Sequence, residues 1–172
     1  MKDQNIRALC LKGVFTALVM AATMVIQIPI PASNGYIHLG DSMILIASVF
    51  CGWSYGLVAG GLGSCLADVL TGYAHWAPFT LVIKALMGLL IGKLSHYDGT
   101  GRFLSARTVF AAAVGLISMI IGYLIGGTVL GKSFLVALTS VPSNAVQAVG
   151  SFVVFAVLGT ALDKAKIRRF LA

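Results

Sequence analysis

Residues 8–28 read ALCLKGVFTALVMAATMVIQI, an apolar segment of the length needed to cross a lipid bilayer. A membrane-spanning α-helix takes about 20 mostly apolar residues, and Pro29 and Pro31 mark the end of this one. The segment is too long for the core of a signal peptide, so we expect it to be retained. It therefore predicts a transmembrane helix at the start of the chain.

The composition extends this interpretation to the whole chain. Of the 172 residues, 59% are hydrophobic and only 10% are charged, whereas a soluble domain carries about 25% charged residues. Such an inventory cannot supply a water-exposed surface. The chain is therefore expected to be an all-α integral membrane protein, with residues 1–172 forming a single membrane domain.

Further apolar segments follow the first. A turn-rich stretch at 31–41 (PASNGYIHLGD) precedes an apolar run at 42–73, which is too long for one span and short for two. Its interruption at 52–56 (GWSYG) predicts two compact helices joined by a tight turn. The six predicted transmembrane helices are 8–28, 42–54, 56–72, 78–94, 108–130 and 140–162.

The basic residues predict the orientation, because Lys and Arg concentrate in cytoplasmic loops. With the N- and C-termini cytoplasmic, the outside loops hold only Lys132, and Lys84 falls within a span. The cytoplasmic set is Lys2, Arg7, Lys12, Lys93, Arg102, Arg107, Lys164, Lys166, Arg168 and Arg169. This distribution explains the net charge of +7 without a nucleic-acid partner. The basic tail KAKIRRF is expected to contact anionic headgroups of the lipid bilayer.

Residues 126–133, GGTVLGKS, match the phosphate-binding pattern G-x-x-x-x-G-K-[ST]. That pattern requires a β-strand before it and a helix after it, whereas here it lies at the outer end of a predicted membrane helix. Lys132 is expected to extend to the membrane interface instead. The match is interpreted as accidental, and no nucleotide hydrolysis is expected of this chain.

Ionisable residues within membrane spans are costly and therefore become candidates for function. Asp68 and Lys84 lie in the third and fourth predicted spans, and His38 and Asp41 lie at the outer entrance of the second. Two interpretations stay open. Asp68 and Lys84 form an ion pair that only satisfies both charges, or the polar residues line a pocket that opens outward beneath the loop 31–41.

Near the outer end of the sixth span, Asn144 and Gln147 are three residues apart and share a helix face. Two carboxamides donate and accept together, which suits a neutral heteroaromatic ring, and hydrogen bonds between helices are the alternative. The outer loops also carry rings that form either an interfacial belt or a stacking surface for a planar ligand. These rings are Tyr36, Tyr73, His75 and Trp76. No second histidine at a ligand spacing accompanies His75, so no metal site is expected.

Small residues recur every four positions on the first span, at Gly13, Ala17 and Ala21. A second series, on the third span, is Gly56, Gly60 and Gly63. Stripes of this kind let helices approach closely. They indicate either packing within the protein or docking of a partner.

Together these features resemble the substrate-binding S components of energy-coupling factor (ECF) vitamin transporters. The resemblance lies in IPIPASNGYIHLGD (28–41) and in the motif Ala17-x-x-x-Ala21. Two further segments are similar to the riboflavin-, hydroxymethylpyrimidine- and pyridoxine-type members. They are GLGSCLADVLTGYAHWAPFTLVIKALMG (61–88) and VPSNAVQAVG (141–150).

The resemblance implies a six-helix fold that captures a vitamin from outside, in a pocket between the first outer loop and helices four to six. It implies a transmembrane T component and two ABC-type ATPases as partners, docked on the stripe that holds Gly13, Ala17 and Ala21. ATP hydrolysis would belong to those partners, so the chain is expected not to be an enzyme and to need no cofactor. Its expected place is the plasma membrane of a prokaryote, as a multi-pass protein.

A small ligand of pyridoxine or hydroxymethylpyrimidine type is favoured, and a riboflavin-specific S component is the alternative. An autonomous secondary transporter, with Asp68 and Lys84 as coupling groups, lacks a convincing inverted repeat with paired broken helices. A membrane-embedded enzyme lacks a catalytic motif such as HExxH. The residues expected to bind the substrate are Asn34, Tyr36, His38, Asp41, Asp68, Tyr73, His75, Trp76, Lys84, Asn144 and Gln147.

Overall fold

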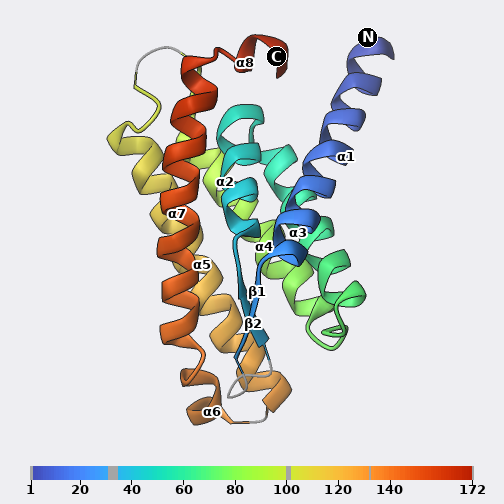
Figure 1. Ribbon diagram of the computed structural model, residues 1–172, viewed down its shortest axis with the longest axis vertical. Helices are drawn as coiled ribbons and strands as arrows, with labels where there is room; N and C mark the ends of the chain where they lie inside the picture. Colours follow the sequence, from blue (N-terminus) through green and yellow to red (C-terminus); the bar gives the residue numbers. More distant parts are fainter. Residues whose placement is uncertain (1, 31–34, 100–101, 132, 172) are drawn as a thin grey trace.

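The structure, a computed structural model, describes residues 2–30, 35–99, 102–131 and 133–171. In these ranges the chain forms helices and one antiparallel hairpin (Figure 1). The helices are α1 (Lys2–Val25), α2 (Gly40–Cys51), α3 (Trp53–Leu70), α4 (Ala77–Ser95), α5 (Ala106–Gly131), α6 (Phe134–Leu138), α7 (Val141–Lys164) and α8 (Arg168–Leu171). The strands are β1 (Gln27–Ile30) and β2 (Gly35–His38).

The helices confirm an all-α architecture of membrane type. In the described part of the chain, four segments are long and apolar enough to cross a membrane, namely Gln4–Val25, Ala77–Ser95, Ala106–Gly131 and Phe134–Lys164. In contrast, α2 has 12 residues, about 18 Å at 1.5 Å per residue, against a hydrocarbon thickness of about 30 Å. The count of six spans and the cytoplasmic termini therefore stay predictions.

The first helix ends at Val25, three residues before the predicted end, because the next residues form a strand. Gln27 pairs with His38, and Ile30 pairs with Gly35, across the hairpin. This hairpin was not predicted from the sequence. Each strand has only four residues, too few for an alternating pattern to be recognised.

The predicted division of residues 42–73 into two helices is confirmed, with the turn at Gly52. This residue has φ of 100°, in the left-handed region that glycine adopts at little cost. The two helices therefore separate at the start of the GWSYG segment and not at its centre. Two further helices, α6 and α8, were not predicted.

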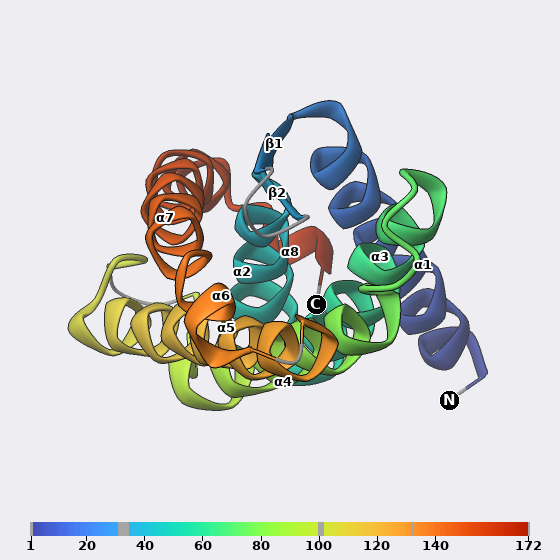
Figure 2. The same ribbon diagram turned by 90° about the horizontal axis from the view of Figure 1, so that it is seen from below.

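The short helix α2 lies at the centre of the bundle and packs against α1, α3, α4 and α7 (Figures 1 and 2). Ten of its 12 residues are buried. A helix that is apolar on all sides is stable only where neighbours surround it. The central position of α2 thus follows from its composition, and it brings Asp41, the acidic residue of its first turn, into the interior.

The glycine stripe of α3 serves internal packing. A Cβ atom on Gly60 would lie 2.7 Å from the carbonyl oxygen of Lys84 in α4, and one on Gly88 would lie 2.2 Å from that of Gly56. A Cβ atom on Gly63 would lie 2.7 Å from the carbonyl oxygen of Thr16 in α1. The backbones of α1, α3 and α4 can approach this closely only because these side chains are absent.

The corresponding stripe of α1 is not used in this way. Gly13, Ala17 and Ala21 are exposed. Apart from the adjacent residues and backbone of α1 itself, no described atom lies within 4 Å of a Cβ placed on Gly13. Instead, α1 packs through its other face, where Phe15 and Val19 are buried. The small-residue face of α1 therefore stays open.

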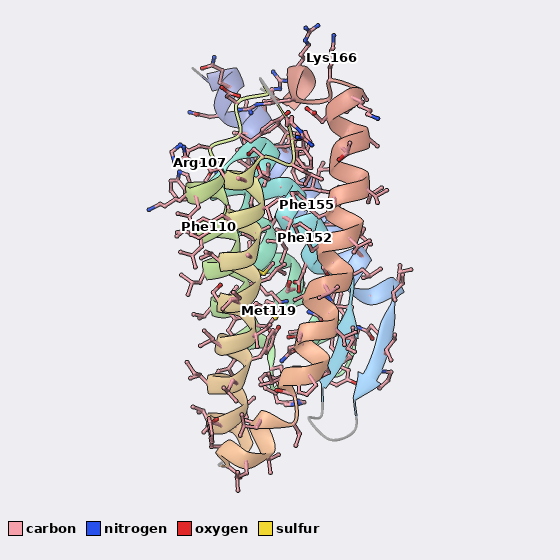
Figure 3. All side chains as sticks on the ribbon, turned by 90° about the vertical axis from the view of Figure 1, so that its left-hand side faces the viewer. Arg107, Phe110, Met119, Phe152, Phe155 and Lys166 are labelled. Atoms are coloured by element: carbon pink, nitrogen blue, oxygen red, sulfur yellow. The ribbon has the colours of Figure 1, made fainter. Side chains whose placement is uncertain are left out.

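The bundle has two distinct ends. The start of α1 and the end of α8 lie at one, here called the terminal end, and the hairpin and α6 lie at the other, here called the hairpin end (Figure 1). Arg107 and Lys166 lie at the terminal end, and Met119, Phe152 and Phe155 lie along the facing sides of α5 and α7 (Figure 3).

Candidate functional site

A buried ion pair joins α2 to α4 near the hairpin. The Nζ atom of Lys84 lies 2.5 Å from Oδ1 of Asp41, and both side chains have 0% exposure. Asp41 stands in the first turn of α2, where the helix dipole also favours a negative charge. Of the two interpretations of the polar residues, the Asp68–Lys84 ion pair is wrong, because Lys84 pairs with Asp41 of the central helix α2.

Gln147 of α7 connects this ion pair to the hairpin. Its Nε2 donates to Oδ2 of Asp41 at 2.8 Å, and its Oε1 accepts the backbone N–H of His38 at 3.1 Å. Both oxygens of Asp41 are thus engaged. We call Asp41, Lys84, Gln147 and His38 the polar network. It links three helices and the hairpin, so it fixes β2 against the bundle.

The imidazole of His38 is neutral in this network. Its Nδ1 accepts the backbone N–H of Gly40 at 3.1 Å, which assigns the ring proton to Nε2. Burial, together with the nearby ammonium of Lys84, lowers the pKa of His38 to about 4. A neutral, buried imidazole adds no further charge to the ion pair.

Asp68 of α3 lies outside the polar network. Its Oδ1 accepts the hydroxyl of Tyr36 at 2.7 Å, and the residue is 4% exposed. Its Oδ2 is buried and has no hydrogen-bond partner in the described part of the chain. Buried polar atoms are hydrogen-bonded in the great majority of cases. The unpaired Oδ2 of Asp68 is therefore an exception that requires an explanation.

A row of rings extends from Tyr36 towards α5. Successive ring centroids lie 4.6, 6.3, 6.3 and 5.7 Å apart, within the range of favourable aromatic pairs. The members of this aromatic row are Tyr36, Tyr73, His75, Trp76 and Tyr123. The rings contact one another, which an interfacial belt would not require, and they offer faces for stacking beside Asp68.

The remaining predicted residues are placed less deeply. Asn144 is half-buried on α7, whereas Gln147 is 3% exposed. His75, in the middle of the aromatic row, is exposed. Asn34 lies outside the described residues.

Sequence reasoning missed three polar residues of this region. Tyr123 lies under Lys84, with the ammonium 5.1 Å from the ring centroid, and its hydroxyl is 3.2 Å from that of Thr80. Ser151, one turn after Gln147 on α7, is buried. A polar residue within an apolar span was the available signal for each, but hydroxyl groups are common in such spans.

The GGTVLGKS segment has the context predicted from the sequence. Residues 126–131 belong to α5, a helix of 26 residues, and the five-residue α6 follows. The strand that a phosphate-binding loop requires is replaced by a helix. Lys132 itself lies outside the described residues.

A groove of about 380 Å³ lies on the outer flank of α4 and α5. Its lining is apolar and includes the exposed side chains of Val82 and Ile125. None of the predicted substrate-binding residues that the structure describes lines it. The groove is part of the exposed apolar surface of the bundle, and its lining shares no residue with the polar network.

A nearly all-helical, apolar bundle with a buried ion pair and a row of contacting rings beside a hairpin defines a class of protein: a membrane protein with a polar and aromatic site inside its helix bundle. The family model described as "ECF-type riboflavin transporter, S component" matches residues 3–164. The chain belongs to this family of membrane S components.

Relatives extend this comparison. An "Uncharacterized protein in gap 3'region" of Pyrococcus woesei is 42% identical over 147 residues, 85% of this chain and 95% of that protein. The "Thiamine precursor transporter HmpT" of Lactococcus lactis subsp. cremoris is 30% identical over 169 residues, 97% of this chain and 94% of that protein. A UPF0397 protein of Streptococcus pneumoniae is 32% identical over 85 residues, 49% of this chain.

Proposed function

We propose that this protein captures a small heteroaromatic vitamin, of pyridoxine or hydroxymethylpyrimidine type, from outside the cell. The observation that carries the proposal is the concentration of buried polar and aromatic side chains at the hairpin end of an apolar bundle. Charged groups within membrane spans are costly and usually functional. The similarity to a thiamine precursor transporter over nearly the whole chain supports a ligand of this size.

In this proposal the ligand lies beneath the hairpin, between the polar network and the aromatic row. Asn144 and Gln147 supply carboxamide donors and acceptors from α7, and His38 closes the site from β2. The rings of Tyr36, Tyr73 and Trp76 stack on the planar ligand. A few polar groups among aromatic side chains form a composition that suits one heteroaromatic ring.

The protein has a fixed orientation in the membrane and acts together with partner proteins. Six helices span the plasma membrane of a prokaryote, with both termini in the cytoplasm, where the basic residues gather at the terminal end. A transmembrane T component docks on the exposed stripe of α1, and two ABC-type ATPases supply the energy. This chain then binds the vitamin and hydrolyses no nucleotide.

The first test identifies the ligand. Mass spectrometry of the small molecules that copurify with the detergent-solubilised protein should detect a pyridine or pyrimidine vitamin. Titration calorimetry with that compound on ligand-depleted protein should then give tight binding at one site per chain. Absence of any bound vitamin, together with no heat for pyridoxine, hydroxymethylpyrimidine or riboflavin, would contradict the proposal.

The docking face has a separate test. Replacing Ala17 and Ala21 together with leucine should abolish uptake in vesicles that contain the T component and both ATPases, because added volume blocks close helix approach. Vitamin binding by the isolated variant should be unchanged. Val157→Leu, which adds volume at an exposed position of α7 and away from α1, is the control. Uptake at the wild-type rate in the double variant would remove this face from the proposal.

Riboflavin is the second candidate, and the description of the family model favours it. The isoalloxazine ring is larger than a single pyrimidine, and it would need more of the aromatic row. Calorimetry with riboflavin beside hydroxymethylpyrimidine distinguishes the two, since a site shaped for one ring excludes the larger one.

A further inference from the structure

The two buried carboxylates of the hairpin end differ in how completely they are paired. Asp41 has one oxygen on Lys84 and the other on Gln147. Asp68 has one oxygen on Tyr36, and its other oxygen, Oδ2, has no hydrogen-bond partner among the described residues. Asp41 is therefore satisfied within the protein, and Asp68 is not.

The neighbours of Asp68 do not offer this oxygen a committed donor. The hydroxyl of Thr80 is within hydrogen-bonding range of the carboxylate, and it also lies 3.2 Å from that of Tyr123. Because a hydroxyl has a single proton to donate, that proton is not reserved for Asp68. The ammonium of Lys84 acts on Asp68 through space, while its contact is with Asp41. His75 also interacts electrostatically with the carboxylate of Asp68, but the His75 side chain is exposed.

A carboxylate oxygen only accepts hydrogen bonds, so a ligand that satisfies it must present a donor. An amino group on a heteroaromatic ring is such a donor, and the adjacent ring nitrogen adds a second N–H when it is protonated. A carboxylate accepts two parallel N–H bonds in this manner, and such charge-assisted bonds are strong. The ring of Tyr36 stands 4.6 Å from that of Tyr73, beside the carboxylate that would hold the ligand's edge.

We propose that Asp68 selects an amino-substituted heteroaromatic ring, of the 4-aminopyrimidine class, through Oδ2. This inference rests on the proposed function and narrows its ligand class. Tyr36 acts as a positioning residue, because its hydroxyl holds Oδ1 and leaves Oδ2 directed at the ligand. A ring with a carbonyl in place of the amino group would set one acceptor against another at this position and bind more weakly.

The test compares two probes on the purified full-length protein by titration calorimetry. They are 4-amino-5-hydroxymethyl-2-methylpyrimidine and its counterpart with an oxo group at position 4. Wild-type protein should prefer the amino probe by about ten- to hundredfold, the ratio expected when one buried hydrogen bond is unmet. Equal affinity for the two probes overturns the inference, and this arm needs no variant.

Variants then locate the preference. Asp68→Asn should weaken binding of the amino probe by about ten- to hundredfold. It should bind the oxo probe more tightly than wild type does, because the carboxamide supplies an N–H donor to the oxo group. Asp163→Asn removes a carboxylate that also accepts a tyrosine hydroxyl, at the other end of the bundle, and should leave both affinities unchanged. An equal loss for both probes in Asp68→Asn would overturn the assignment of Asp68.

The outcomes separate this inference from the proposed function. Wild-type protein that binds riboflavin or pyridoxine but neither pyrimidine overturns the role of Asp68 and leaves vitamin capture intact. Protein that binds no vitamin overturns both. If Asp68→Asn does not fold, Tyr36→Phe provides the second variant, and it should reduce the preference for the amino probe by freeing Oδ1 and loosening the carboxylate.

Discussion

The two ends of the molecule carry the same pair of side chains in different surroundings. At the hairpin end, Tyr36 donates to Asp68, which is 4% exposed and keeps one oxygen unpaired in the described chain. At the terminal end, Tyr97 donates to the half-buried Asp163. Arg168 lies over the ring of Tyr97, 5.5 Å from its centroid, and donates to its backbone carbonyl.

The difference shows what surroundings do to a tyrosine–aspartate pair. At the terminal end Arg168 of α8 adds a cation beside the pair, and the carboxylate of Asp163 is accessible to water. These contacts attach the C-terminal segment to the start of the α4–α5 connection. At the hairpin end the second oxygen is buried and has no such complement. One pair is structural, and we infer that the other is open to a ligand.

The largest difference between the two ends is expected in the stability that is lost when the cation at each end, Lys84 or Arg168, is replaced. Lys84→Met leaves Asp41 buried without its counter-charge and should lower the free energy of unfolding by about 3–5 kcal/mol. Arg168→Met, at the half-buried terminal pair, should cost less than about 1 kcal/mol. Denaturant unfolding of the purified protein in detergent measures both. Equal losses would mean that the two ends are held in the same way.

The next largest difference between the two ends is expected in how substitutions there change the affinity for the vitamin. Gln147→Ala and Asn144→Ala should each weaken vitamin binding by about ten- to hundredfold, since a lost partner in a buried site costs about 1–3 kcal/mol. The effect should be greater for Gln147, which is 3% exposed. Tyr97→Phe at the terminal end is the control and should bind as wild type does. Wild-type affinity in both carboxamide variants would place the ligand elsewhere.

The two ends should also respond to opposite extremes of pH. The pKa of His38 is lowered by burial to about 4 from an ordinary value of 6.5. The unfolded chain therefore takes up the proton first, and stability falls as the pH drops from about 6.5 towards about 4. Thermal unfolding across this window should show a smaller fall in His38→Asn than in wild type.

The pKa of Tyr97 is raised to about 12 from 10.0, by burial first and then by the hydrogen bond to Asp163. The unfolded chain loses that proton first, so stability falls as the pH rises from about 10 towards about 12. Tyr97→Phe should flatten this alkaline loss, and His38→Asn should not. If the stability of Tyr97→Phe changed at acid pH but fell at alkaline pH as steeply as that of wild type, the division between the two ends would be contradicted.

The smallest effect is expected for Lys132, beside the glycine-rich segment of α5. Lys132→Ala should leave vitamin uptake at the wild-type rate, because the segment lacks the strand of a phosphate-binding loop. Purified wild-type protein should likewise show no magnesium-dependent ATP hydrolysis. Hydrolysis that this substitution abolishes would overturn the interpretation of GGTVLGKS as an accidental match.

Much of the helical architecture follows from the sequence. Length and apolar content locate α4, α5 and α7 to within two residues, and the glycine at position 52 divides α2 from α3. The polar candidates are also visible, since charged and carboxamide side chains are rare in apolar spans. Asp41, Lys84 and Gln147 were all predicted to bind substrate, and they meet in one network.

The sequence could not assign partners to these residues. Lys84 pairs with Asp41, 43 residues away, and Gln147 reaches Asp41 across 106 residues. Such contacts depend on the rotation of each helix about its own axis. In a soluble protein the polar residues mark the exposed face of a helix and thereby give its rotation. A helix between lipid and core is apolar on both sides, so its hydropathy pattern does not show which face is buried.

The two small-residue stripes illustrate the same limit. Gly13, Ala17 and Ala21 have the spacing of Gly56 and Gly60, yet the first stripe is exposed and the second packs against α4. The sequence by itself determined that the chain is helical, apolar and basic at one end, because length, hydropathy and charge are local properties. Only the tertiary structure decided which faces meet, which carboxylate is satisfied and which remains open, because these depend on packing around the central helix α2.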